Sequence, residues 1–351
     1  MNRTKDLFCW AFLSGCVFVP FASAAEPPRV RVATVRKAFD NGQHNAFTDL
    51  CQFGGRYYLA FRSCPDGHMV HPTSTIIILS SKDGRNWQQV HRFGVNKRDV
   101  RDPHFLVFKN RLFVFTGTWY CGDDSPDHYD MNELLGYAAW TDDGATWQSP
   151  IMLEGTFAHY IWRAATYGNK AYLCGRRKAN FEVGPRGEGR RVEALMLESD
   201  DGLIWRKAAM FQEEDGDETA FLFEADGAVL AVARRGRGNA QICRSRPPYD
   251  RWQRTDLDRY IGGPLLKKWG DHYLVGGRNM QTGRPLTSLC WLVDDQLHEF
   301  AQLPSGGDTS YPGFVLRSPT EAILSYYSSH EKDEAGKTCT NIYLAELEME
   351  E

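Results

Sequence analysis

The chain has 351 residues, of which 42% are hydrophobic and 13% aromatic, with 32 glycines and a formal net charge of -4. This composition is sufficient for a large folded core and excludes a disordered or fibrous chain. The weak net charge argues against a generally basic surface, so no nucleic-acid partner is expected.

The N-terminus has the pattern of a secretory signal. Arg3 and Lys5 precede the apolar run 7–21, and Ala22-Ser23-Ala24 fits a cleavage site. We therefore predict a signal peptide over residues 1–24 and export to the periplasm or beyond the cell. The run is short for a membrane span, so no integral membrane span is expected. Lipoprotein anchoring at Cys16 is a minor alternative.

The cysteines do not indicate a metal site. Seven follow residue 24, at positions 51, 64, 121, 174, 243, 290 and 339, and none forms a Cys-x-x-Cys pair. An exported chain can form one or two disulfides from such a set, but buried single thiols are expected for most of these residues.

Six hairpins follow one another along the chain. Their predicted tips are Gly54-Gly55, Lys109-Asn110, Gly168-Asn169, Asp226-Gly227, Gly270-Asp271 and Ser318-Pro319. The strands after the tips are 57–61, 112–115, 171–174, 229–233, 273–275 and 322–326. A further strand follows in each unit, and no helical periodicity of useful length is present.

Three of these units contain the same turn. The copies are 81–87, 141–147 and 199–205, each reading Ser/Thr-x-Asp-Gly-x-x-Trp, with aspartates 60 and then 58 residues apart. Asp and Gly suit a tight turn, because Asp bonds the backbone ahead and Gly tolerates a positive φ. Repetition at a near-constant period indicates a repeat architecture.

Six units of three or four strands predict an all-β fold, a six-bladed β-propeller. No linker divides residues 25–351, so we expect a single domain. A strand over 30–35 is expected to complete the last blade and close the ring.

The repeat also predicts where a site lies. Residues before each first strand and after each second strand should meet around the axis. The first group is 44–49, Arg101-Asp102-Pro103, Trp162-Arg163, Asp217-Glu218, Gly262-Gly263-Pro264 and 308–312. The second group includes Arg62, Arg176, Arg234 and Arg278. An arginine ring matches an anionic ligand, although each arginine can equally pair with a neighbouring acid.

Tyr311 and Glu218 are the candidate reactive pair. A tyrosine beside a carboxylate base can attack an anomeric carbon, and its neutral hydroxyl does not repel an anionic sugar. The plainer alternative is a core tyrosine and a surface acid.

The chain resembles the sialidase (neuraminidase) superfamily. The three Asp-Gly turns resemble its Asp-box repeats, the segment 217–227 running on to Arg234 resembles the stretch with the catalytic Glu, and Thr309-Ser310-Tyr311 resembles that with the nucleophilic Tyr. The resemblance implies Tyr311 as nucleophile, Glu218 as its partner, and Arg234 and Arg278 as carboxylate ligands.

The first sialidase motif, Phe/Tyr-Arg-Ile-Pro, is absent, and residues 44–49 take its place. Arg62 or Arg101 is the expected substitute for the missing arginine. The general acid is left open between Asp66, Asp49 and Asp102. Trp162, Arg163 and His68 are expected to contact the sugar.

Together these patterns predict an exported exo-glycosidase acting on sialylated or other anionic glycans, with no cofactor and no metal. A non-catalytic glycan- or protein-binding propeller is one alternative. A glycosidase of another sugar that uses two carboxylates is the other.

Overall fold

The computed structural model describes residues 26–128, 130–183, 191–281 and 283–350. The predicted signal peptide, with Cys16, lies outside this part. The described chain forms 24 β-strands and two 3-10 helices, η1 (Met131–Glu133) and η2 (Ala179–Phe181), and it contains no α-helix. None of its helices has the length and apolar character needed to span a membrane.

Four sheets contain four antiparallel strands each and follow one another in chain order. They are β6 (Arg98–Phe108), β7 (Arg111–Tyr120), β8 (Leu135–Thr141) and β9 (Trp147–Met152); β10 (Tyr160–Tyr167), β11 (Lys170–Lys178), β12 (Val192–Ser199) and β13 (Arg206–Gln212); β14 (Gly216–Phe223), β15 (Val229–Arg235), β16 (Gly238–Ser245) and β17 (Trp252–Asp256); and β18 (Gly262–Trp269), β19 (His272–Asn279), β20 (Leu286–Val293) and β21 (Gln296–Leu303).

An eight-stranded sheet contains both ends of the described chain. Its strands are β1 (Val30–Phe39), β2 (His44–Phe53), β3 (Arg56–Cys64), β4 (Thr75–Ser81), β5 (Gln88–Phe93), β22 (Thr309–Leu316), β23 (Glu321–Lys332) and β24 (Thr338–Met349). Its two halves, β2 to β5 and β22 to β24 with β1, are joined by one parallel pair, His44 with Thr340.

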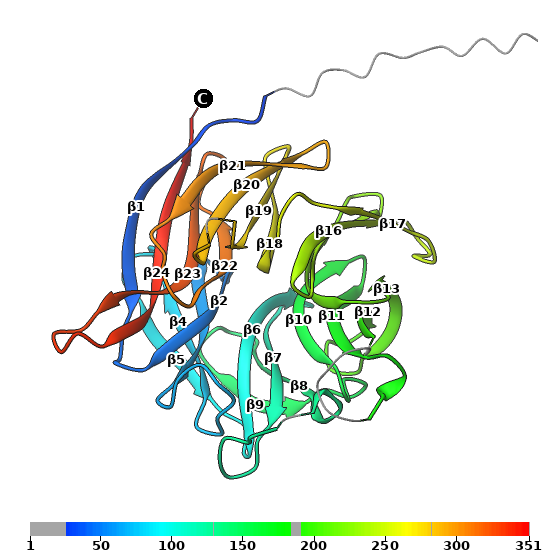
Figure 1. Ribbon diagram of the computed structural model, residues 1–351, viewed down its shortest axis with the longest axis horizontal. Coiled ribbons are helices and arrows are strands. Elements are labelled where there is room, and N and C mark those ends of the chain that lie inside the picture. The colour runs from blue at the N-terminus through cyan, green and yellow to red at the C-terminus, as the bar shows by residue number, and fades with distance from the viewer. Residues whose placement is uncertain (1–25, 129, 184–190, 282, 351) are drawn as a thin grey trace, which may run out of the picture.

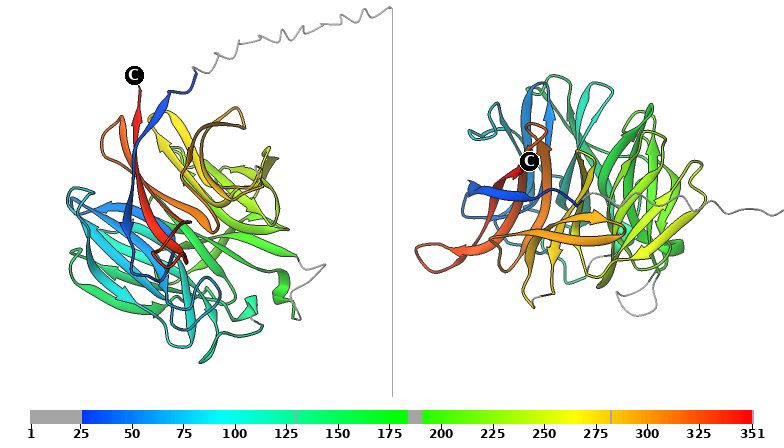
Figure 2. Two further views of the ribbon diagram at one scale, coloured as in Figure 1. Left: turned by 60° about the vertical axis from the view of Figure 1, so that its left-hand side comes forward. Right: turned by 90° about the horizontal axis from the view of Figure 1, so that it is seen from above.

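The sheets surround a central axis, so the fold is an all-β propeller (Figure 1). The predicted closing strand is confirmed, since β1 pairs antiparallel with β24 along the outer edge (Figure 2). All six predicted tips join the first and second strands of a hairpin. The predicted count of six blades depends on reading the eight-stranded sheet as two blades.

The core lies between neighbouring sheets. Ile76 and Ile78 of β4 pack with Phe105 and Val114 of the next sheet, and all four side chains are buried. Burying one such side chain stabilises the fold by about 1.5–3 kcal/mol. The seven cysteines in the described residues are free thiols, and five of them are buried. The prediction that most are buried single thiols is therefore confirmed.

Each of the three Asp-Gly turns packs against a neighbouring hairpin unit, as the second copy illustrates. Asp143 Oδ1 accepts hydrogen bonds from the backbone N–H groups of Ala145 and Thr146 at 2.8 and 2.7 Å. Gly144 has φ +77°, and a Cβ there would meet the Tyr58 hydroxyl, which donates to the Gly144 carbonyl. The turn therefore needs glycine both for its backbone and for its contact with the neighbouring sheet.

Candidate active site

The first strand of every hairpin carries a β-bulge at the same place. Its pairing with the second strand skips two residues, which are Phe47-Thr48, Asp102-Pro103, Trp162-Arg163, Asp217-Glu218, Gly263-Pro264 and Tyr311-Pro312. A bulge releases a residue from the ladder and redirects its side chain, and proline is tolerated there because it has no N–H to donate. The bulges therefore explain why these particular residues gather around the axis.

A cavity of about 230 Å³ opens at these bulges. Its charged lining residues are Arg101, Asp102, Arg176, Glu218, Arg234 and Arg278, and its lining also includes Phe47, His68, Tyr160 and Tyr311. Four arginines thus face two carboxylates, an excess of positive charge that suits an anionic ligand.

Tyr311 and Glu218 are in direct contact. The Tyr311 hydroxyl donates to Glu218 Oε1 at 2.6 Å, and both residues are buried. Burial and the Glu218 charge hold the pKa of Tyr311 well above its usual value. The tyrosine is therefore neutral at rest, and the carboxylate is placed to remove its proton.

Glu218 is held in its charged form. Its Oε2 accepts hydrogen bonds from Arg234 Nη1 at 3.0 Å and from the Gly263 N–H at 2.9 Å. Although burial disfavours the charge, Arg234 and Arg176 lower the pKa of Glu218 to about 2. Asp217 forms ion pairs with both Arg176 and Arg234, and its distance to Arg234 Nε is 3.2 Å. This network fixes the guanidinium groups beside the cavity.

Arg278 is fixed by a second set of partners. Its Nη2 lies 3.1 Å from Asp308 Oδ1 and 2.9 Å from the Tyr327 hydroxyl, and its Nε donates to the Thr309 carbonyl at 2.9 Å. The guanidinium carbon lies 5.4 Å from the centre of the Tyr311 ring. A preformed cation therefore lies next to the candidate nucleophile.

Asp102 is a buried carboxyl group in the lining of the cavity. One oxygen accepts a hydrogen bond from the Tyr160 hydroxyl, and the other, Oδ1, has no hydrogen-bond partner among the described residues. Burial and the nearby Glu218 charge raise the pKa of Asp102 to about 6. This side chain can hold or release a proton in mildly acidic solution.

Several predicted site residues do not reach the cavity. Arg62 is fully buried, where it bonds Asp99 at 2.8 and 3.0 Å, so it is not available to a ligand carboxylate. Trp162 is buried against His104, with ring centres 4.8 Å apart. Asp66 is exposed and accepts a hydrogen bond from Thr73. The placement of these residues does not fit the roles predicted for them, which were carboxylate binding for Arg62, sugar contact for Trp162 and proton donation for Asp66.

Asp49 and Arg163 form a buried pair at 3.2 Å, away from the cavity lining. Arg163 also donates to the carbonyls of Pro264 and Pro312 at 2.8 and 2.6 Å. The pair thus ties first strands together, and neither residue lines the cavity, where sugar contact by Arg163 or proton donation by Asp49 would need it.

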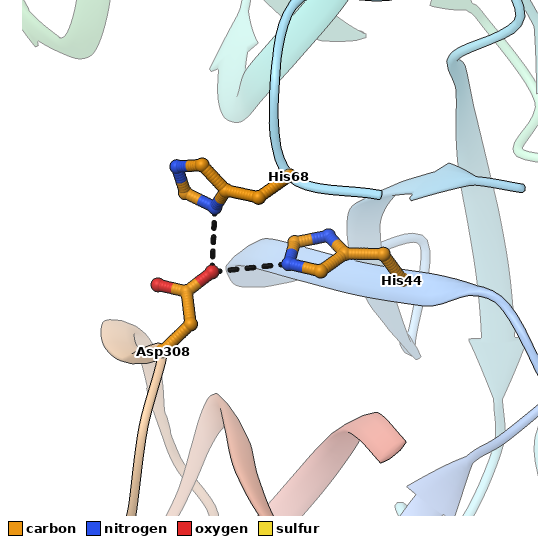
Figure 3. Close-up of side chains that lie close together, drawn as sticks. All are labelled: His44, His68 and Asp308. Carbon is orange, nitrogen blue, oxygen red and sulfur yellow. Dashed lines mark hydrogen bonds and ion pairs between the residues drawn. The ribbon is translucent and has the colours of Figure 1, made fainter. Parts of the chain in front are cut away.

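His44, His68 and Asp308 have potential metal-ligand atoms within 4.8 Å of one another. Both rings reach the same oxygen, Asp308 Oδ2, at 3.0 and 2.6 Å, which are hydrogen-bond distances (Figure 3). The other oxygen already binds Arg278. A divalent cation would compete with this guanidinium, so the donors fit hydrogen bonding better than metal coordination.

Several residues of this site have only a weak signal in the sequence. Arg176 belongs to the predicted arginine ring, but the resemblance assigns it no role. Asp217 and Asp308 are adjacent to or near the candidate pair in sequence, yet their function as arginine partners depends on side-chain directions. Tyr160 has no sequence signal except its place just before a first-strand bulge.

No family model and no curated protein sequence matches this chain. Solved structures do match. Phage phi92 endosialidase superposes with a TM-score of 0.66 at 10% identity, over 91% of this chain and 69% of that one. Trypanosoma rangeli sialidase in complex with sialic acid gives a TM-score of 0.62 at 13% identity, over 90% of this chain but only 57% of that one. The fold is thus sialidase-like, and at these identities the likeness concerns the fold alone.

Proposed function

We propose that this protein is an exported exo-glycosidase that releases a terminal sialic acid or a related anionic sugar from glycans. The observation that carries the proposal is the 2.6 Å contact between Tyr311 and Glu218 inside an arginine-lined cavity. T. rangeli sialidase, which has a similar fold, has a solved structure in complex with sialic acid. A cavity of about 230 Å³ is small for a ligand site and suits a single enclosed sugar better than a chain.

In the proposed reaction, Arg176, Arg234 and Arg278 bind the carboxylate of the sugar, with Arg101 completing the positive wall. The Tyr311 oxygen forms a bond to the anomeric carbon while its proton passes to Glu218. The bond to the leaving oxygen breaks, and that oxygen takes a proton from a general acid. Of the three carboxylates predicted for this last role, Asp102 alone lines the cavity.

The finer architecture belongs to the same proposal. Reading the eight-stranded sheet as two blades gives six, because only the pair His44 and Thr340 links its halves. The mature chain would then be a single domain over 25–351, and the segment 1–24 would direct its export.

The test is release of a fluorogenic aglycone from an α-linked sialoside by wild type and by Tyr311→Phe. We expect turnover by wild type and loss of about 10³-fold or more in the variant, because phenylalanine keeps the ring and removes the nucleophilic oxygen. Thermal melts check folding. Full activity of Tyr311→Phe would favour a glycosidase that uses two carboxylates instead of a tyrosine. A wild type that is inactive but binds glycans on an array would favour a non-catalytic glycan-binding propeller.

Gly263→Ala should impair the same reaction through Tyr311. Gly263 has φ +59°, and a Cβ there would lie 2.6 Å from the Tyr311 ring, so the tyrosine must move. A displacement of this kind costs on the order of 10²-fold in kcat/KM. Gly270→Ala is the matched control, since Gly270 has φ +60° with nothing within 4 Å. Equal activity of the two variants would show that the contact with Tyr311 does not matter.

A further inference from the structure

His68 is the most exposed ionisable side chain of the cavity. It is 43% exposed, whereas the four arginines that line the cavity expose at most 22% of their side chains, and Asp102 and Glu218 are buried. An exo-glycosidase encloses the terminal sugar and leaves the rest of the glycan in solvent. The oxygen that must be protonated therefore lies towards the mouth of the cavity, where His68 is and where Asp102 is not.

The partner of His68 orients it for proton transfer. His68 Nδ1 lies 2.6 Å from Asp308 Oδ2 (Figure 3). Despite burial, the hydrogen bonds from His44 and His68 keep the pKa of Asp308 well below its usual range, so the carboxylate can only accept. Nδ1 therefore carries a proton, and Nε2, which has no hydrogen-bond partner among the described residues, is the nitrogen left for a substrate.

Two arginine side chains hold the loop that carries His68 by hydrogen bonds to its backbone carbonyls. Arg62 donates to the carbonyls of Gly67 and Met69, both at 2.9 Å. Arg101 donates to the carbonyls of His68 and Met69 at 2.8 and 3.0 Å. The buried Asp99 pairs with both arginines. Although His68 is exposed, the backbone of residues 67–69 is thus fixed by four charge-assisted hydrogen bonds, as a catalytic group requires.

We propose that His68, oriented by Asp308, is the general acid, and that Asp102 instead contacts the enclosed sugar. In its protonated form the ring keeps Nδ1–H on Asp308 and donates the Nε2 proton to the glycosidic oxygen. That oxygen takes the electron pair of the breaking bond, while the Tyr311 oxygen bonds to the anomeric carbon and its proton passes to Glu218. The inference rests on the function proposed above and deepens it.

The leaving group provides the test. A phenol such as 4-methylumbelliferone leaves without much help from an acid, whereas the sugar alcohol of sialyllactose needs a proton. We expect His68→Ala to lose about 10²–10⁴-fold in kcat/KM on sialyllactose and far less on the 4-methylumbelliferyl sialoside. Asp102→Asn is the matched comparison, assayed at pH 5, where Asp102 is mostly protonated. It should slow both substrates by similar factors.

Two results would overturn the inference. One is equal loss on both substrates in His68→Ala while thermal melts stay unchanged. The other is selective loss on sialyllactose in Asp102→Asn, which would make Asp102 the acid. A wild type that hydrolyses neither substrate is a different failure, since it overturns the proposed function and this inference with it.

Discussion

Replacing Glu218 with Gln is expected to lower kcat/KM on an α-sialoside by about 10³-fold or more, which corresponds to about 4 kcal/mol. Gln has nearly the same shape and keeps an oxygen for the Tyr311 hydroxyl, but it cannot take the phenolic proton. Burial and the neighbouring Glu218 charge keep the tyrosine neutral at rest, so it depends on a base at the moment of attack. Steady-state kinetics measure the loss.

The double variant tells whether the two residues act as one unit. If Glu218 serves only Tyr311, adding Tyr311→Phe to Glu218→Gln should cause little further loss. Glu224→Gln is the matched control, because Glu224 lies just beyond the same strand and bonds Tyr273 and Lys268 at 2.6 and 3.1 Å, outside the cavity lining. Near-normal turnover by Glu218→Gln would contradict the proposed reaction.

The framework of this propeller was readable from sequence because it depends on local chemistry. The Asp-Gly turns, the hairpin tips and the closing strand each require particular residues within a few positions of one another. The contact between Tyr311 and Glu218, which are 93 residues apart, was reached through the resemblance and agrees with the structure.

The partners of the arginines could not be read in the same way. In sequence Arg62 and Arg278 both follow a second strand, and both looked like ligands for a carboxylate. The structure buries Arg62 on Asp99 and leaves Arg278 at the cavity. The difference depends on the direction of each side chain and on an acid elsewhere in the chain. Neither feature follows a repeating pattern from which it could be predicted. The pairing of His68 with Asp308, 240 residues away, was invisible for the same reason.

Arg163→Ala is expected to cause the largest loss of stability, about 3–5 kcal/mol in the free energy of unfolding. The substitution leaves the buried carboxylate of Asp49 without its ion pair and the carbonyls of Pro264 and Pro312 without their donor. These groups belong to the first strands β2, β18 and β22 of three hairpins, so the substitution weakens contacts around the centre of the propeller. Denaturant unfolding followed by tryptophan fluorescence measures it.

The matched control is Arg254→Ala. Arg254 also donates to two carbonyls, those of Phe211 and Met210 at 2.6 and 3.1 Å, but it lies on an outer strand where water can replace it. Its removal should cost about 1 kcal/mol. If both variants lost the same free energy of unfolding, burial of Arg163 and its partners would make no extra contribution to stability.

Acid unfolding gives an independent check on Asp49. Despite burial, the His104 ring, 3.5 Å away, and the charge of Arg163 lower the pKa of Asp49 to about 2, below its value in the unfolded chain. A carboxyl with a depressed folded pKa stabilises the protein fully above the unfolded pKa of about 4, and this contribution of roughly 2 kcal/mol is lost as the pH falls towards 2. Wild type should therefore lose more stability between pH 4 and pH 2 than Asp49→Asn, which has no such group to protonate. If the two proteins lost the same amount over that interval, the Asp49–Arg163 pair could not be what holds the first strands together.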